Sequence, residues 1–279
     1  MNSMKQLNEQ EIKEISLDIL NFITNKCDEM NLKYVLVWGT LIGAVRHNGF
    51  IPWDDDIDIA MPRKDYEILI EYMTSNDNQP YSLVSVYNEN NYNYLVSRVV
   101  NTKTFIKLEC KSNLNRMEHG VFVDIYPIDK CGVSMDDAFT FFKKQMHLET
   151  LRTMALSQSF VKAKTSWLKT VVKYPVYVYA KIRGSKYFLS HLEKNARNAN
   201  NKEGEFYCCW CGTGGMDYHK LIFDRNIFEN VLKCKFEDNE YFIPQEYDYV
   251  LTKVYGEYMK LPPEMDRIGH HFYKAYYLQ

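Results

Sequence analysis

The sequence predicts a mixed α/β fold, because segments of helical periodicity alternate with short runs of strand character. Residues 8–30 repeat isoleucines at intervals of three and four, as an amphipathic helix does. Residues 135 to about 200 return to a helical pattern over a longer stretch. Short apolar or alternating runs indicate strands at 34–38, 56–62, 81–87, 94–100, 104–110 and 120–129.

The N-terminal elements follow one another closely. Asn31 is a suitable end for the first helix, and the apolar run YVLVW (34–38) follows as a buried strand. Gly39-Thr40 breaks this strand and forms a tight turn before a short helix over 41–47. Further along, we expect a turn at 48–52, a half-buried strand at 56–62, a helix at 63–74, a strand at 205–212 and a helix at 247–256.

The composition is that of a globular protein with one large domain or two small ones. Of the 279 residues, 46% are hydrophobic and 25% are charged, which excludes a disordered chain and provides a sizeable core. The polar start of the chain does not resemble a signal peptide, and no run of about 18 uncharged apolar residues occurs. The expected compartment is therefore the cytosol, where the seven cysteines would be reduced.

Charge is unevenly distributed along the chain. The stretch from Lys143 to Lys202 holds 13 Lys or Arg and 2 Asp or Glu, a charge of +11. Because the net charge of the whole chain is −2, the remaining residues together carry −13. Such asymmetry indicates either an anionic partner, such as nucleic acid or a membrane surface, or a solvated helical face. Nucleic acid is disfavoured, because the rest of the chain is acidic and no RNA-binding signature is present.

Four aspartates fall within five positions in WDDDID: Asp54, Asp55, Asp56 and Asp58. In a strand, residues two apart point the same way, so Asp56 and Asp58 would lie side by side and repel unless a cation bridges them. Asp124, inside the apolar run 120–129, would complete a carboxylate site for Mg²⁺, or for Mn²⁺, that holds phosphate groups. Asp54 and Asp55 are interpreted as turn or cap residues.

The segment before the aspartates has features of a phosphate site. Backbone N–H groups and the Thr40 hydroxyl, at a turn that opens a helix, suit a phosphate. Arg46 and His47, at the end of that helix, would add positive charge. Together with Asp56, Asp58 and Asp124, this pattern predicts a site for a metal-bound diphosphate.

WGTLIGAVRHNGFIPWDDDIDIAMPRKDYE (38–67) closely resembles the signature of the LicD family, phosphocholine transferases of bacterial surface glycans with the fukutin proteins as distant relatives. Three later segments are similar to the same family: 120–129, 243–263 and RIGHH (267–271). No motif is recognised in the basic helical stretch. The resemblance implies a nucleotidyltransferase-like core, a small mixed sheet flanked by helices. It divides the chain into a catalytic core (1–134), a helical basic insertion (135–205) and a completing C-terminal part (206–279).

The resemblance also implies the chemistry. The donor would be CDP-choline or another CDP-alcohol, and the acceptor a sugar hydroxyl of a lipid-linked cell-surface glycan or teichoic acid precursor. The metal ligands carried across are Asp56, Asp58 and Asp124. The acceptor hydroxyl, positioned near Asp124, would attack the phosphorus that carries the alcohol, and CMP would leave. Alternatives are a ribitol- or glycerol-phosphate transferase, a nucleotidyltransferase that releases pyrophosphate, and an inactive nucleotide-binding module.

Choline is a quaternary ammonium, which aromatic cages bind. Trp53, beside the acids, is the first candidate, and Tyr255 is another in the matched segments. A polyol donor would need no cage, and each aromatic has core packing as its alternative. The pair His270-His271 has either a substrate-binding or a packing role.

Two further segments have open interpretations. Cys208, Cys209 and Cys211 either contribute zinc ligands or are buried thiols; the second is favoured, because the spacing is not a C-x-x-C pair. Residues 166–184 mix apolar, aromatic and basic side chains. They either lie in a membrane interface, which would suit an enzyme at the inner face of the plasma membrane, or form a pair of core helices broken at Pro175.

Overall fold

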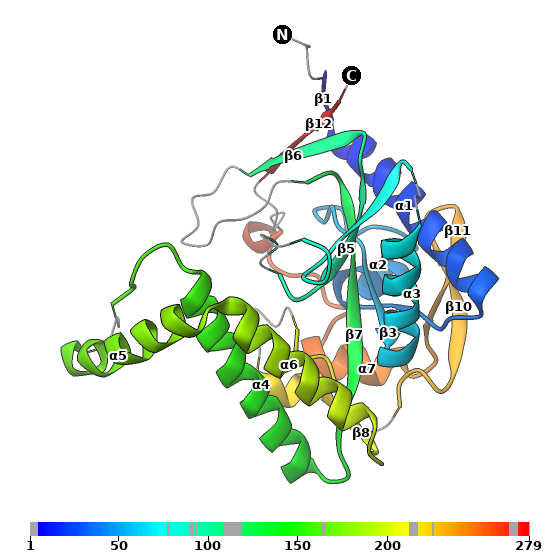
Figure 1. Ribbon diagram of the computed structural model, residues 1–279. Coiled ribbons are helices and arrows are strands. Elements are labelled where there is room, and N and C mark those ends of the chain that lie inside the picture. The colour runs from blue at the N-terminus through cyan, green and yellow to red at the C-terminus, as the bar shows by residue number, and fades with distance from the viewer. Residues whose placement is uncertain are drawn as a thin grey trace. The chain divides into compact units, whose positions relative to one another are not determined.

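The computed structural model (Figure 1) describes residues 5–76, 79–89, 92, 94–108, 119–162, 166–211, 217–224, 226–267 and 273–278. Helices and strands alternate along these residues, which confirms the predicted α/β class. The chain forms two compact units. The first unit comprises Met1–Cys110, Glu118–Ile128 and Asn226–Gln279, and the second Lys111–Met117 and Asp129–Arg225. The predicted division at 134/135 and 205/206 stays a prediction.

The first unit is built on a mixed sheet. Its strands, in spatial order, are β2 (Val35–Leu36), β3 (Asp58–Pro62), β7 (Phe122–Gly132), β5 (Ser97–Asn101) and β4 (Tyr81–Val84). Strands β3 and β7 pair in parallel, and the other neighbours are antiparallel. The register places Asp58 opposite Asp124 on β7, which in turn lies opposite Arg98 on β5.

Four helices accompany this sheet: α1 (Glu9–Met30), α2 (Trp38–His47), α3 (Arg63–Ser75) and α7 (Tyr247–Tyr255). Helix α1 contacts β5, α3 contacts β3 and β4, and α2 contacts β3 and α7. Asn8 and Glu11 form a capping box at the start of α1, and Asn31 ends it in the left-handed conformation. The predicted helix over 8–30 is therefore confirmed, with a buried stripe that includes Ile12, Ile19 and Ile23.

Some strands of the first unit were not expected. Among these, strand β12 (Tyr273–Tyr277) joins β1 (Lys5–Gln6), which was also not expected, to β6 (Thr104–Leu108), which corresponds to the strand expected at 104–110. Strands β10 (Val231–Phe236) and β11 (Asn239–Pro244) form a hairpin, whose turn places Glu237 at a φ of 54°. The hairpin escaped prediction because Lys233, Cys234 and Lys235 interrupt its apolar character. A 3₁₀ turn, η2 (Glu264–Asp266), precedes the C-terminal strand.

The second unit is largely helical, as predicted for 135–200. It contains α4 (Met135–Leu156), α5 (Trp167–Arg183), α6 (Ser185–Asn200), η1 (Tyr218–Leu221) and the short strands β8 (Phe206–Cys208) and β9 (Ile222–Phe223). The last residues of β7 pair with β8. Leu151, Ala180 and Phe188, one from each long helix, share a buried cluster.

The expected break at Pro175 is wrong. Helix α5 continues through Pro175 and ends at Gly184, whose φ is 77°. Proline removes a helical hydrogen bond to the residue four positions earlier, here Val171. Because both residues are exposed, the freed carbonyl can bond to water, and the helix tolerates the interruption.

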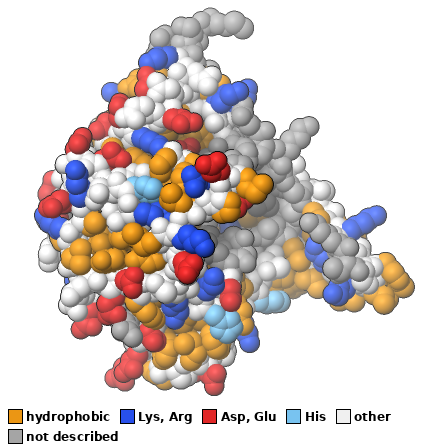
Figure 2. Space-filling model, turned by 180° about the vertical axis from the view of Figure 1, so that it is seen from behind, with side chains coloured by type: hydrophobic (Ala, Val, Ile, Leu, Met, Phe, Trp, Pro, Cys, Tyr) orange, Lys and Arg blue, Asp and Glu red, His pale blue; other side chains and the backbone are white. Residues whose placement is uncertain are grey.

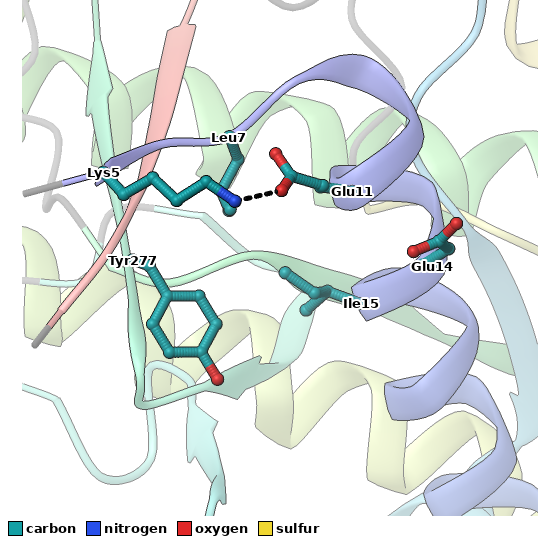
Figure 3. Close-up of a pocket in the computed structure, with 6 residues that line it drawn as sticks. All are labelled: Lys5, Leu7, Glu11, Glu14, Ile15 and Tyr277. Carbon is teal, nitrogen blue, oxygen red and sulfur yellow. Dashed lines mark hydrogen bonds and ion pairs between the residues drawn. The ribbon is translucent and has the colours of Figure 1, made fainter.

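A pocket of about 400 Å³ in the first unit is lined by Lys5, Leu7, Glu11, Glu14, Ile15 and Tyr277. Figure 3 shows the Lys5–Glu11 ion pair beside it, with an N···O distance of 2.5 Å. None of these residues belongs to the predicted site. Among the described residues, no helix is both long and apolar enough to cross a membrane.

Candidate functional site

The predicted metal ligands converge at the start of strand β3. The strand begins at Asp58, so Asp56 lies in the segment just before it rather than within it as predicted. Asp58 and Asp124 occupy paired positions on the neighbouring parallel strands β3 and β7, so they lie side by side in the sheet. The Asp124 N–H donates to Ile57 O at 2.9 Å, which fixes the two strands at this point.

Asp58 is the most unusual group of the site. It is only 7% exposed, and its Oδ1 has no hydrogen-bond partner in the described part of the chain. Burial, followed by the negative charges of Asp56, Asp124 and Asp54, raises the pKa of the Asp58 carboxyl well above its usual value, and a hydrogen bond from Tyr126 opposes this shift. A buried carboxylate oxygen without a hydrogen-bond partner, close to other acids, is energetically costly. A bound cation would lower this cost by neutralising the negative charge.

The structure also brings Asp54 and Asp55 close to Asp56. Ligand oxygens of Asp54, Asp55 and Asp56 all lie within 4.8 Å of one another, and the three side chains are half-buried. The backbone of Asp54 also donates to Ile51 O at 2.9 Å, as expected of a turn residue. These acids therefore shape the turn and also offer oxygens to a cation.

Asp124 is held by a residue that the sequence analysis missed. Arg98 on β5 donates from Nε to Asp124 Oδ1 at 2.6 Å and from Nη2 to Oδ2 at 3.2 Å, a bidentate ion pair. Its Nη1 lies 2.9 Å from His119 Nε2. Arg98 interrupts the apolar run of β5. A single arginine inside such a strand was the sequence feature that could have indicated a buried ion-pair partner.

Gly39 and Thr40 do not form a turn before the helix as predicted. Helix α2 already begins at Trp38, so both residues lie in its first turn, where backbone N–H groups have no helical partner. The Thr40 hydroxyl accepts a hydrogen bond from the Asp58 N–H at 2.9 Å and so anchors β3. A Cβ on Gly39 would lie 2.6 Å from Asp54 Oδ2, so glycine allows the acid to approach the helix N-terminus.

Arg46 and His47 lie in the last turn of α2, at the opposite end of the helix from Gly39. Arg46 donates from Nη1 to Tyr258 O at 2.5 Å and from Nε to His47 Nε2 at 2.9 Å. Burial lowers the pKa of His47, and the charge of Arg46 lowers it further. The described contacts of this pair tie α2 to the loop after α7, and their role toward phosphate stays a prediction.

Of the predicted aromatic residues, Trp53 contacts His47 and Arg267, and Tyr255 lies near the acids. The Trp53 ring packs edge-on to His47 at a centroid distance of 6.5 Å, and the Arg267 guanidinium lies over it at 5.7 Å. Burial, then the charges of Asp58, Asp54 and Asp56, raises the pKa of Tyr255 above its usual value.

Tyr273, which the sequence analysis did not single out, also lies near the acids. Burial and the charges of Asp55 and Asp56 raise the pKa of its hydroxyl, which shares a hydrogen bond with Asp55. The predicted pair His270-His271 lies outside the described residues.

The cysteine segment belongs to the second unit. Cys208, Cys209 and Cys211 are buried, and Cys209 Sγ lies 3.7 Å from Cys211 O. Burial and a hydrogen bond with Cys131 raise the pKa of the Cys208 thiol well above its usual value. Such surroundings favour protonated thiols over the thiolates that bind zinc, in line with the buried-thiol interpretation that the sequence favoured.

Comparison with known proteins places these residues in a family. Residues 31–167, which hold α2, β3 and β7, match the family model of the LicD/FKTN/FKRP nucleotidyltransferase domain. The chain is 28% identical over 279 residues to the lipopolysaccharide cholinephosphotransferase LicD of Haemophilus influenzae, covering 99% of this chain and 100% of that protein. Uncharacterised proteins of Rickettsia prowazekii and Rickettsia typhi are each 57% identical over 35 residues, 12% of this chain and 13% and 11% of theirs. Residues 31–167 thus carry the nucleotidyltransferase domain of the LicD family, and the chain as a whole is similar to a cholinephosphotransferase.

Proposed function

We propose that this LicD-family phosphotransferase transfers phosphocholine from CDP-choline to a sugar hydroxyl of a cell-surface glycan precursor and releases CMP. The full-length relative is named as a lipopolysaccharide cholinephosphotransferase, which supports phosphocholine and a glycan as donor group and acceptor. The observation that carries the proposal is the buried Asp58, with an orphaned Oδ1, among Asp54, Asp56 and Asp124.

This set of carboxylate oxygens fits a divalent cation. Hard cations such as Mg²⁺ prefer carboxylate oxygens and share their remaining positions with water and substrate phosphates. Asp56 and Asp58 would hold the ion, with Asp124 as the third protein ligand and Asp54 and Asp55 next to it. When bound, Mg²⁺ or Mn²⁺ would neutralise charge on the diphosphate and on the transferring phosphoryl oxygens.

The chain's own groups have distinct tasks in the transfer. The N–H groups in the first turn of α2, which have no partner within the helix, suit a phosphate of the donor. Asp124, oriented by Arg98, takes the proton of the acceptor hydroxyl, whose oxygen attacks the phosphorus that carries choline. The new P–O bond forms as the bond to the CMP oxygen breaks, and the choline phosphate is left on the sugar.

Trp53 supports choline rather than a polyol. In the structure its ring already carries a cation, the Arg267 guanidinium at 5.7 Å. A quaternary ammonium is attracted to an indole face by the same electrostatics. The choline group would take the place of the guanidinium there, with Tyr255 beside the acids as a second aromatic wall.

The acceptor we propose is a lipid-linked precursor, of lipopolysaccharide, capsule or teichoic acid. Such precursors carry the sugar on a lipid in the membrane. The enzyme would then work as a peripheral protein at the inner face of the plasma membrane.

A donor panel tests this function. CDP-choline, CDP-ribitol and CDP-glycerol are each added with Mg²⁺, and thermal stabilisation and CMP release onto a glycan acceptor are measured. We expect CDP-choline alone to give a large shift and turnover, both abolished by EDTA. A selective response to CDP-ribitol or CDP-glycerol would identify a polyol-phosphate transferase instead.

A variant pair controls this experiment. Asp58→Asn should lose both the Mg²⁺-dependent shift and turnover, whereas Glu14→Gln, in the pocket of Figure 3, should keep both. Binding of cytidine nucleotides without turnover on any acceptor would favour an inactive binding module. No response to any cytidine nucleotide would overturn the transferase proposal.

A further inference from the structure

Helix α5 of the second unit exposes an apolar surface that the proposed chemistry does not use. Only Ala180 is fully buried, and Thr170, Lys173 and Tyr177 are half-buried. These four positions recur at intervals of three and four, so they form one narrow stripe that packs on the unit. Ala180 shares its buried cluster with Leu151 of α4 and Phe188 of α6.

The rest of the helix is exposed and mostly hydrophobic. Trp167 is 73% exposed, Val172 71% and Ile182 79%. Its other exposed large hydrophobic residues are Leu168, Val171, Tyr174, Val176, Val178 and Tyr179. Leu168, Val172, Tyr179 and Ile182 fall on the side of the helix opposite the packed stripe, because both sets keep helical spacing half a turn apart. Helix α5 is labelled in Figure 1, and Figure 2 shows hydrophobic and basic side chains at the right edge, where this helix lies.

Positive charge accompanies this apolar surface. Residues 150–192 contain eight Lys or Arg and no Asp or Glu. Lys162, Lys169 and Arg183 are exposed, and the last two belong to α5 itself. Lys173 and Lys181 instead donate to backbone carbonyls of Val161, and of Ala155 and Ser157, and so attach the helix to the preceding segment.

We propose that α5 docks on an anionic lipid bilayer, with its apolar side in the interface and its basic residues at the headgroups. An interfacial helix combines a hydrophobic side, aromatic residues and Lys or Arg at its borders, and α5 has all three. Its lysines exclude a transmembrane role, and no described helix qualifies as a membrane span. The absence of acids over residues 150–192 matches the negative surface of a bilayer.

A protein partner fits these observations less well. Protein interfaces are depleted in lysine at their apolar centre, whereas here Lys169 and Arg183 border the apolar side near the two ends of the helix. Membrane docking deepens the proposed function by naming the surface at which a lipid-linked acceptor is met. The docking observation itself stands on α5 and not on the acidic site.

The test uses the full-length protein and no nucleotide. Flotation is measured with vesicles of phosphatidylcholine alone and with vesicles that also contain phosphatidylglycerol. We expect the protein to float with the anionic vesicles only and to be released at high salt, since screening weakens headgroup attraction. Asp58→Asn should float like the unaltered protein, so that failure of docking and failure of catalysis are separable.

Two sets of substitutions assign the binding to α5. The combined change Val171→Ser, Val172→Ser and Ile182→Ser should lower vesicle partitioning at least about ten-fold, and Lys162→Glu with Lys169→Glu should abolish the preference for anionic lipid. Because these side chains are exposed, the midpoint of thermal unfolding should not change. Val133→Ser, at a residue that is 61% exposed but lies outside α5, is the matched control and should float normally.

Three outcomes would overturn the proposal. One is an absence of flotation with anionic vesicles at low salt, and another is unchanged flotation of the triple serine variant. The third is a concentration-dependent dimer, in sedimentation without lipid, that the serine variant loses, because α5 would then be an interface between two copies of the chain.

Discussion

At the scale of single residues, the structure is organised around the cost of burying Asp58. Burial and the charges of Asp56, Asp124 and Asp54 raise its pKa, and a hydrogen bond from Tyr126 partly compensates. An acid whose pKa is raised on folding binds a proton more tightly in the folded state than in the unfolded state. Its contribution to stability is therefore lost as the pH rises from the unfolded value, about 4, through the folded one.

This argument predicts opposite effects of Asp58→Asn on stability and on activity. In EDTA at neutral pH the variant should be more stable than the unaltered protein, because it removes a buried charge, and this advantage should shrink as the pH falls toward 4. Choline phosphate transfer should fall at least about 100-fold. Urea denaturation across this pH range, with and without Mg²⁺, gives the measurement. Equal stability of the two proteins at every pH would contradict it.

His119 supplies a second pH prediction with the opposite sign. Burial, then the neighbouring Arg98, lowers its pKa from 6.5 to about 4, and its ring nitrogens lie 2.9 Å from Arg98 Nη1 and from Gly120 O. The folded state keeps it neutral while the unfolded state takes up a proton below pH 6.5, so stability is lost as the pH falls from 6.5 to 4. The loss is at most about 3 kcal/mol.

His119→Gln should remove most of this loss, because glutamine keeps an acceptor for Arg98 and does not titrate. The comparison is the free energy of unfolding of both proteins at pH 7, 5.5 and 4. A parallel decline in the two proteins would show that other groups cause the acid sensitivity.

The sequence was informative about site residues where a local rule applied. The alternation around Asp58 and the apolar surroundings of Asp124 both marked carboxylates with an unusual position, and the structure pairs them. Arg98 reaches the acids because β5 pairs with β7, and Tyr273 because the C-terminal strand β12 returns to the first unit. No local sequence pattern encodes either of these long-range arrangements. The same holds for Asp54 and Asp55, which form a turn by composition but also face Asp56 in space.

At the scale of elements, the start of α2 and the start of β3 form one structure. Thr40 in the helix accepts from the Asp58 N–H in the strand, and Gly39 lets Asp54 approach. The predicted helix start at residue 41 is three residues late, because glycine and threonine favour turns. Trp38 instead enters the helix with a φ of 51° that tryptophan rarely adopts. Tertiary packing, not local propensity, determines where this helix begins.

Gly39→Ala tests separately how this position affects the stability of α2 and how it affects metal binding by Asp54. Alanine favours the helix by about 1 kcal/mol, so stability in EDTA should be unchanged or higher. Its Cβ would lie 2.6 Å from Asp54 Oδ2, and the displaced carboxylate should weaken Mn²⁺ binding several-fold in a titration. Gly43→Ala is the control with the reverse result: its Cβ would meet the backbone oxygen of Gly49, so stability should fall. Unaltered Mn²⁺ affinity in Gly39→Ala would exclude Asp54 from the site.

At the scale of the whole molecule, strand β7 links the two units covalently. Residues 122–128 pair with β3 and β5 in the first unit, and the same strand continues to pair with β8 in the second. Loss of the first unit's sheet would remove the order of the strand on which β8 depends. The two units should therefore unfold in one transition, although the chain divides into them.

Buried cysteines in each unit test this coupling. Cys27 belongs to the first unit, where burial raises its pKa to about 12, and Cys208 belongs to the second, where it is also fully buried. Protonated, buried thiols react only after unfolding, so pulsed alkylation with mass spectrometry reports each unit separately. We expect both thiols to become reactive at the same urea concentration, and donor with Mg²⁺ to shift both midpoints equally. Half-buried Cys234 should react before the transition and serves as the internal control. A shift confined to Cys27 would show that β7 does not transmit stability between the units.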